Sequence, residues 1–187
     1  MITCMSDHAA DKFWRGTPLG CGAELAPWLR DRGSLTKRIQ QRCVHFAVRG
    51  VRSGLARIAL DESALLDLAP RQLAYSREVF LYADDQPVVF AHSALAREHL
   101  RGAWSAVRML GNKPLGALLF AHPLVERKPL HYQTLRITHP LYHRAARVLR
   151  HPPHRLWARR SLFYLNDAPL LVTEVFLPGI LLLADPV

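Results

Sequence analysis

Hydrophobic residues are most concentrated between positions 162 and 178, in the stretch LFYLNDAPLLVTEVFLP. The pattern predicts two β-strands joined by a tight turn, because an Asn-Asp pair between apolar runs is a hairpin signal. In the second strand Glu174 shares a face with Val172 and Phe176, since side chains alternate along a strand. A carboxylate on an apolar face is destabilising unless a partner compensates its charge. The pattern therefore predicts a buried partner or ligand for Glu174.

A second hairpin is predicted between residues 75 and 90, where YSREVFLY, the turn ADDQ and PVVFAHS follow one another. Alternation along its first strand places Arg77 on the same face as Val79 and Leu81. Arg77 is therefore a second charge on an apolar strand face and mirrors Glu174. Three interpretations stay open for Arg77 and Glu174. They bind a ligand in a shared pocket, they form a structural ion pair, or they lie at solvated edges of the sheet.

Helices are predicted where apolar residues recur at helical spacing between start and stop signals. Ser34 is a candidate N-cap for the segment LTKRIQQR. A longer helix is predicted from Ser93 to Leu110, ended by Gly111, and a short one follows from Pro114 to Phe120.

The remaining segments complete an α+β domain on an antiparallel sheet. Residues 43–60 are predicted as two strands with a bend at their glycines, residues 61–70 as a short helical turn or loop, and residues 124–137 as a further strand.

The chain is long enough for one domain with a hydrophobic core that needs no covalent staple. We assign residues 1–23 to an N-terminal leader and residues 24–187 to a single domain. Within that domain, residues 139–154 form a connector rich in Pro, His and Arg.

Cysteine usage and hydropathy indicate the compartment. The chain has three cysteines without C-x-x-C spacing, which disfavours a disulfide framework or a structural zinc site. The N-terminus lacks the basic start and apolar run of a signal peptide, and the apolar run at residues 179–184 is too short to cross a bilayer. We therefore expect a cytoplasmic protein without stable membrane association.

The formal net charge is +10, which leaves several kinds of partner open. A positive charge of this size is compatible with binding to a nucleic acid, an anionic surface or a small anionic substrate, and also with a role in solubility alone. The basic residues are spread from Arg30 to Arg160 rather than held in one block, and this dispersion disfavours a nucleic-acid-binding protein.

Several histidines in the second half of the chain raise the question of a metal site. Their spacing matches no zinc motif and no Cys or acidic residue accompanies them, so no metal is expected. They are His131, His139, His143, His151 and His154.

Four segments, taken together and in this order, resemble the chorismate pyruvate-lyase family. The resemblance spans about residues 24 to 178. It implies a six-stranded antiparallel sheet flanked by helices, with the ligand enclosed between the sheet and helical flaps. It also implies an enzyme that makes 4-hydroxybenzoate for ubiquinone synthesis. The segments are GSLTKR (33–38), SREVFLYADDQPVVFA (76–91), GNKPLGALLF (111–120) and LWARRSLFYLNDAPLLVTEVFLP (156–178).

The resemblance also implies roles for four residues. Arg77, from the family's R-E strand, would hold a substrate carboxylate, and the backbone amide of Leu115 would face it. Glu174, from L-T-E, would hydrogen-bond the ring hydroxyl. Leu35 stands where the family often has methionine, a swap that keeps size and apolar character. The connector at residues 139–154 and the leader are longer than is usual in the family.

The chemistry implied is the loss of pyruvate from chorismate, which leaves an aromatic ring. Such a step requires a fixed substrate conformation and stabilised charge, with no metal or redox cofactor. Arg77 and Glu174 are the candidate catalytic residues, and Leu35 and Leu115 complete the candidate substrate-binding set. Arginine suits a carboxylate because its planar fork binds two oxygens and stays charged when buried.

Structural explanations exist for the same residues. Leu35 and Leu115 fit a hydrophobic core. Four basic residues are expected to be solvated or helix-end charges: Lys37, Arg38, Arg159 and Arg160.

Two other functions stay open. The fold implied also resembles the effector-sensing domains of some bacterial transcription regulators, so the chain could bind a hydroxybenzoate-like effector without turning it over. Such sensors carry a DNA-binding winged helix ahead of this domain, and the residues before position 24 are too few for one. A lyase could also release 3-hydroxybenzoate. We expect a monomer whose partner is chorismate, without nucleic acid.

Overall fold

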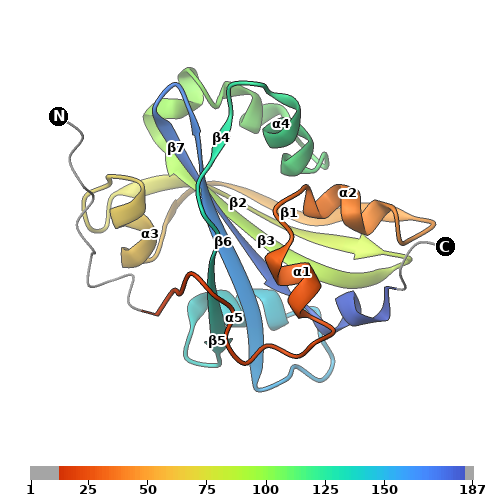
Figure 1. The fold of residues 1–187 in the computed structure, drawn as a ribbon. Helices are drawn as coiled ribbons and strands as arrows, with labels where there is room; N and C mark the ends of the chain where they lie inside the picture. The colour runs from red at the N-terminus through yellow and green to blue at the C-terminus, as the bar shows by residue number, and fades with distance from the viewer. Residues whose placement is uncertain (1–12, 184–187) are drawn as a thin grey trace.

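Seven strands form one antiparallel sheet in the order β1-β2-β3-β7-β6-β4, and β5 pairs with β6 beside this path (Figure 1). The computed structural model describes residues 13–183 of the chain. The α+β class with an antiparallel sheet is confirmed, with one strand more than the six that the resemblance implies. The segment 124–137 forms two short strands, whereas the segment 43–60 forms one. The strands are β1 (Phe46–Arg57), β2 (Leu73–Ala83), β3 (Gln86–Ala96), β4 (Glu126–Arg127), β5 (His131–Arg136), β6 (Arg155–Leu165) and β7 (Ala168–Phe176).

Both predicted hairpins are confirmed, and they occupy the middle of the sheet. The β2–β3 turn is Asp84-Asp85 and the β6–β7 turn is Asn166-Asp167, with positive φ at all four residues. Asn and Asp tolerate this left-handed conformation, which two-residue hairpin turns require. Strands β3 and β7 pair with each other, so the two hairpins lie side by side.

The predicted helix from Ser93 to Leu110 is wrong. Strand β3 continues to Ala96, and two 3₁₀ helices follow it: η2 (Arg97–Arg101) and η3 (Ser105–Met109). The end of β3 is buried on both faces, so it lacks the alternation that identifies a half-exposed strand. Trp104 lies between these two 3₁₀ helices and is buried. Its indole N–H donates to the Ala168 carbonyl at 3.0 Å.

The segment 43–60 forms one strand rather than the two predicted. β1 is continuous over 12 residues, and its pairing with β2 shifts between Arg49 and Arg52. Gly50 lies in this irregularity with φ of +63°, a conformation that favours glycine. The bend expected from the glycines is therefore a local irregularity within one strand.

Helices cover both faces of the sheet (Figure 1). One face, here called the front face, carries α1 (Ala26–Arg30), α2 (Leu35–Gln40) and α4 (Leu115–Ala121). The opposite, back face carries α3 (Leu60–Leu65) and α5 (Pro140–Ala146). The short η4 (Pro178–Leu182) follows β7.

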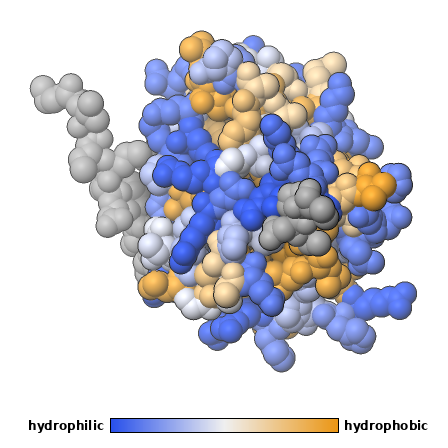
Figure 2. All heavy atoms as spheres, turned by 45° about the vertical axis from the view of Figure 1, so that its right-hand side comes forward, coloured by the Kyte–Doolittle hydropathy of each residue, from blue (hydrophilic) through white to orange (hydrophobic). Residues whose placement is uncertain are grey.

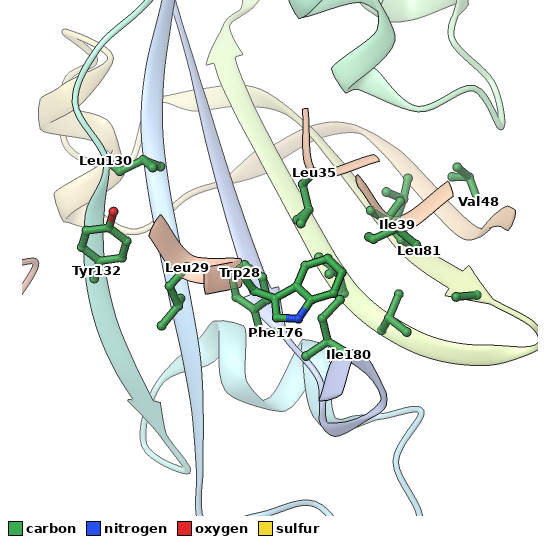
Figure 3. Packing of buried hydrophobic residues seen from close by; sticks show 14 residues of the cluster. Trp28, Leu29, Leu35, Ile39, Val48, Leu81, Leu130, Tyr132, Phe176 and Ile180 are labelled. Carbon is green, nitrogen blue, oxygen red and sulfur yellow. The ribbon is translucent and has the colours of Figure 1, made fainter. Parts of the chain in front are cut away.

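Hydrophobic side chains of α1 and α2 fix these helices on the front face. Figure 3 shows Trp28 and Leu29 of α1 and Leu35 and Ile39 of α2 packed with strand residues such as Phe176. All five are buried, and each stabilises the fold by about 1.5–3 kcal/mol. The predicted N-cap of α2 is confirmed, since the Ser34 hydroxyl accepts from the Lys37 amide at 3.3 Å.

Segments outside the main elements also contact the domain. Trp14 is buried, and Arg15 exchanges two backbone hydrogen bonds with Tyr132 of β5, at 2.9 and 2.8 Å. In the connector 139–154, the Tyr142 hydroxyl of α5 donates to the Pro153 carbonyl at 2.5 Å. Residues 1–12, most of the predicted leader, lie outside the described residues, and the domain boundary stays a prediction.

Hydrophilic residues take up most of the face shown in Figure 2, and hydrophobic residues show between them in several places. Within residues 13–183, none of the helices has the length and hydrophobicity to span a membrane.

Candidate active site

A largely enclosed pocket lies between the front face of the sheet and the helices α2 and α4. Side chains of β2, β3 and β7 form its floor, and the first residues of α2 and α4 form its cover. The structure brings all four predicted site residues into its lining: Leu35, Arg77, Leu115 and Glu174. The predicted strand alternation accounts for Arg77 and Glu174, which both lie on the front face of the sheet. Leu35 and Leu115 come from the helices that cover it.

Arg77 is buried beneath α4, with 4% of its surface exposed. Its Nη2 donates to the carbonyls of Gly111 and Lys113, at 3.0 and 2.9 Å, and so fixes the loop that leads into α4. Burial lowers the pKa of the guanidinium, but an arginine remains charged in a protein. Among residues 13–183, no carboxylate lies within ion-pair distance of Arg77, so the expected alternative of an ion pair with Glu174 is not observed.

Glu174 instead pairs with Arg159, the residue opposite it on β6. The Glu174 Oε2 accepts from Arg159 Nε at 2.6 Å. The Arg159 Nη1 also donates to the carbonyls of Trp28, Leu29 and Asp31 at the end of α1, at 2.9, 3.2 and 2.6 Å. Arg159 is completely buried. It therefore holds the Glu174 carboxylate in place and links α1 to the sheet.

The expectation that Arg159 and Arg160 are solvated is wrong for both residues. Arg160 is 2% exposed and its Nη1 donates to Asp61 Oδ2 at 2.5 Å, with its guanidinium 4.2 Å from the centre of the Trp14 ring. Both arginines are covered because the sheet carries helices on its two faces, which strand alternation alone does not reveal.

A second guanidinium, that of Arg127 on β4, also lines the pocket. Its Nη1 donates to the Arg32 carbonyl at 2.7 Å, and its carbon Cζ lies 5.6 and 5.2 Å from the ring centres of Phe120 and Phe163. Burial lowers the pKa of Arg127, while the nearby Glu174 carboxylate opposes this shift. Arg127 was not among the predicted site residues, because β4 has two residues and leaves no periodic pattern in the sequence.

The cover of the pocket is formed by two closely packed helix starts. Leu115 begins α4, and its backbone amide is among the first amides of a helix, which have no acceptor within the helix. Gly116 approaches α2 so closely that a Cβ there would lie 3.2 Å from Thr36 Oγ1. The Leu35 side chain extends from the start of α2 into the same lining. The cover therefore brings apolar side chains and the start of α4 over the charged floor.

On the back face, directly behind the pocket, a row of polar side chains crosses the sheet. Glu78, His92, Thr173 and Arg160 are cross-strand neighbours on β2, β3, β7 and β6. His92 is 1% exposed, with Nε2 3.3 Å from Glu62 Oε1 and Nδ1 3.4 Å from Glu78 Oε1. These are ion-pair distances without aligned hydrogen bonds. Burial disfavours the charged imidazole, but the two carboxylates prevail and raise the pKa of His92 to about 9.

The His92 cluster should make stability depend on pH. A histidine whose pKa rises from 6.5 to about 9 on folding contributes stability below pH 6.5 that is lost as pH rises through 9. The pKa of Glu78 is lowered to about 2 by His92 and Arg144 against its burial, so its contribution is present above pH 4.5 and lost toward pH 2. We expect the free energy of unfolding to be highest near pH 4.5–6.5. It should fall by roughly 3 kcal/mol toward pH 9.5, at 1.36 kcal/mol for each unit of pKa change.

Urea unfolding curves between pH 5 and 9.5 measure this effect. The fall should be absent in His92→Gln and unchanged in the control His151→Gln, which alters an exposed histidine. Equal pH dependence in the wild type and His92→Gln would contradict the prediction.

The histidines considered as metal ligands do not converge. Within the described part of the chain, no group of three or more His, Cys, Asp or Glu side chains could hold a metal ion. His139 instead caps α5, where its Nδ1 accepts from the Leu141 amide at 3.2 Å. The described cysteines, Cys21 and Cys43, are free thiols.

Comparison with known proteins extends these observations. The family model described as chorismate lyase matches residues 19–183. The probable chorismate pyruvate-lyase of Nitrosospira multiformis is 51% identical over 172 residues, which cover 91% of this chain and 96% of that protein. The protein of the same description from Aromatoleum aromaticum is 53% identical over 161 residues, covering 85% and 87%.

Among solved structures, the C-terminal domain of PhnF superposes with a TM-score of 0.55 and 12% identity, over 79% of this chain and 91% of that one. This similarity extends to the fold alone.

Proposed function

Because the chain belongs to the chorismate lyase family, we propose that its enclosed pocket converts chorismate to 4-hydroxybenzoate and pyruvate. The observation that carries this proposal is the placement of Arg77 and Glu174 on one pocket floor, each with separate partners. The two charged groups are thus held apart and can act on two ends of one ligand. We further propose that the product supplies ubiquinone synthesis.

In the proposed reaction, chorismate binds with its ring carboxylate at Arg77 and at the Leu115 amide. The hydrogen on the ring carbon that carries the hydroxyl moves to the methylene carbon of the enolpyruvyl group. The ether bond between that group and the ring breaks, so its oxygen becomes the ketone of pyruvate and the ring becomes aromatic. All atoms of both products come from chorismate, and we propose no cofactor for the step.

The protein contributes position and electrostatics to this step. Arg77 is already fixed by two carbonyls, so it can bind a carboxylate without reorganising. Glu174, oriented by Arg159, accepts a hydrogen bond from the ring hydroxyl and so sets the rotation of the ring. Leu35 and the other apolar lining exclude water around the reacting bonds.

Sequence identity to the relatives favours an enzyme over a non-catalytic effector-binding module. The relatives described as probable chorismate pyruvate-lyases are about half identical over most of the chain, whereas the PhnF domain is 12% identical. We propose that the enzyme is a cytoplasmic monomer, which suits the free thiols of Cys21 and Cys43. Its net charge of +10 would also favour the approach of a dianionic substrate.

A turnover assay with purified, chelator-treated protein tests the proposal. We expect 4-hydroxybenzoate and pyruvate in equal amounts from chorismate, identified by chromatography, at a rate that chelator does not change. Binding of 4-hydroxybenzoate without any turnover would instead identify an effector-binding module. Release of 3-hydroxybenzoate would correct the product.

A further inference from the structure

The pocket lining carries more positive charge than a ligand with a single carboxylate would require. Arg77 and Arg127 both line it, and Glu174 is the one anionic group in the described lining. Arg159, beside Glu174 on the same face of the sheet, pairs with it, so the charge of Glu174 is already compensated. The two lining guanidinium groups therefore leave a net positive charge for a ligand.

On the proposed function, chorismate brings two carboxylates into this pocket, one on the ring and one on the enolpyruvyl group. A carboxylate removed from water needs a charged or hydrogen-bonded partner. Arg77 takes the ring carboxylate. We propose that Arg127 binds the enolpyruvyl carboxylate and is thereby the residue that distinguishes substrate from aromatic product.

The surroundings of Arg127 support this assignment. Its Nη1 is used by the Arg32 carbonyl, but its Nε is buried without a hydrogen-bond partner among the described residues. Buried donors are nearly always paired. An unpaired guanidinium N–H beside a pocket is therefore a candidate donor for a hydrogen bond to a bound ligand. Phe120 and Phe163 contact the guanidinium and limit its movement. A carboxylate would satisfy the free donor and offset the burial of the cation.

The role also explains why the site needs two arginines on separate elements. Arg77 lies on β2 and Arg127 on β4, on opposite sides of the β3–β7 pair in the strand order. 4-Hydroxybenzoate has one carboxylate, which Arg77 binds. Once pyruvate has left, Arg127 contributes little to the affinity of the remaining product.

Arg127→Met removes the charge and keeps a long apolar side chain. We expect kcat/KM for chorismate to fall by about 100-fold, as when one partner of a buried charge pair is removed. The dissociation constant of 4-hydroxybenzoate should change by less than about 3-fold. Arg127→Lys, which keeps the charge but loses the planar fork, should lie between Arg127→Met and the wild type.

Two controls separate binding from other effects. Arg108→Met removes the same charge from an exposed site, so it reports any loss of long-range attraction and should change kcat/KM by less than about 3-fold. Thermal unfolding and 4-hydroxybenzoate titration of each variant report whether the pocket is intact. Equal losses for chorismate and 4-hydroxybenzoate would overturn the proposal and leave Arg127 as a structural link to Arg32. No loss for either ligand would overturn it as well.

The proposed function and this inference can fail separately. If the wild type does not turn over chorismate, the proposed function fails. The inference is then read from the dissociation constants of chorismate and 4-hydroxybenzoate, and only a loss confined to chorismate in Arg127→Met would support it.

Discussion

Replacing Arg77 with glutamine should lower kcat/KM for chorismate by about a thousandfold and weaken 4-hydroxybenzoate binding with it. Removing one partner of a buried charge pair costs about 2–5 kcal/mol or more, and each 1.36 kcal/mol is a factor of ten. Glutamine keeps a polar amide on the pocket floor but is shorter than arginine, so the carbonyls of Gly111 and Lys113 lose their direct donor. Thermal unfolding of the variant therefore reports how far the loop before α4 depends on Arg77.

Steady-state kinetics and product titration on Arg77→Gln and Arg77→Lys measure the effect. The lysine variant keeps a charge but cannot offer two parallel donors, so it should recover only part of the activity. The melting temperature of Arg77→Gln should fall by a few degrees at most, which separates a lost ligand contact from a lost fold. Activity within tenfold of the wild type would mean that Arg77 fixes the α4 loop and does not bind substrate.

Local signals in the sequence predicted much of the sheet. The two hairpins followed from Asp-Asp and Asn-Asp turns between apolar runs, whose residues adopt the left-handed conformation. Alternation then placed Arg77 and Glu174 on an inner face, and both line one pocket. A single charge in an apolar strand is informative because its burial requires a partner.

The partner of Glu174 could also have been found from the sequence. In a two-residue hairpin, residues pair outward from the turn, so Leu165 faces Ala168 and, further along, Arg159 faces Glu174. This register excludes a solvated Arg159, because it places Arg159 beside Glu174 on the inner face of the sheet. Hairpin register follows from the turn alone, before any tertiary contact is known.

Other features depend on packing that the sequence does not display. The end of β3 is buried on both faces, so its apolar run matched a helix equally well. Arg127 reaches the pocket from a two-residue strand, and its contacts with Arg32 and Phe163 join segments far apart in the chain. Such placements are set by the assembled layers and not by local propensity.

Arg159→Met should be the most destabilising substitution near the site, lowering the free energy of unfolding by about 3–5 kcal/mol. The variant leaves the Glu174 carboxylate without its buried partner. It also removes the donor shared by the carbonyls of Trp28, Leu29 and Asp31, so the attachment of α1 to the sheet should weaken. Urea unfolding at pH 6 measures the change.

A double-mutant cycle separates these two contributions. Glu174→Leu alone leaves Arg159 as an unpaired buried cation, whereas Arg159→Met with Glu174→Leu replaces the pair by apolar groups. Because replacing both partners removes the uncompensated charge, the double variant should be more stable than the sum of the single changes predicts, by about 2 kcal/mol. The stability that the double variant does not recover then measures the three carbonyls of α1. Strict additivity of the two single changes would show that Arg159 stabilises the protein through α1 alone and that Glu174 does not depend on it.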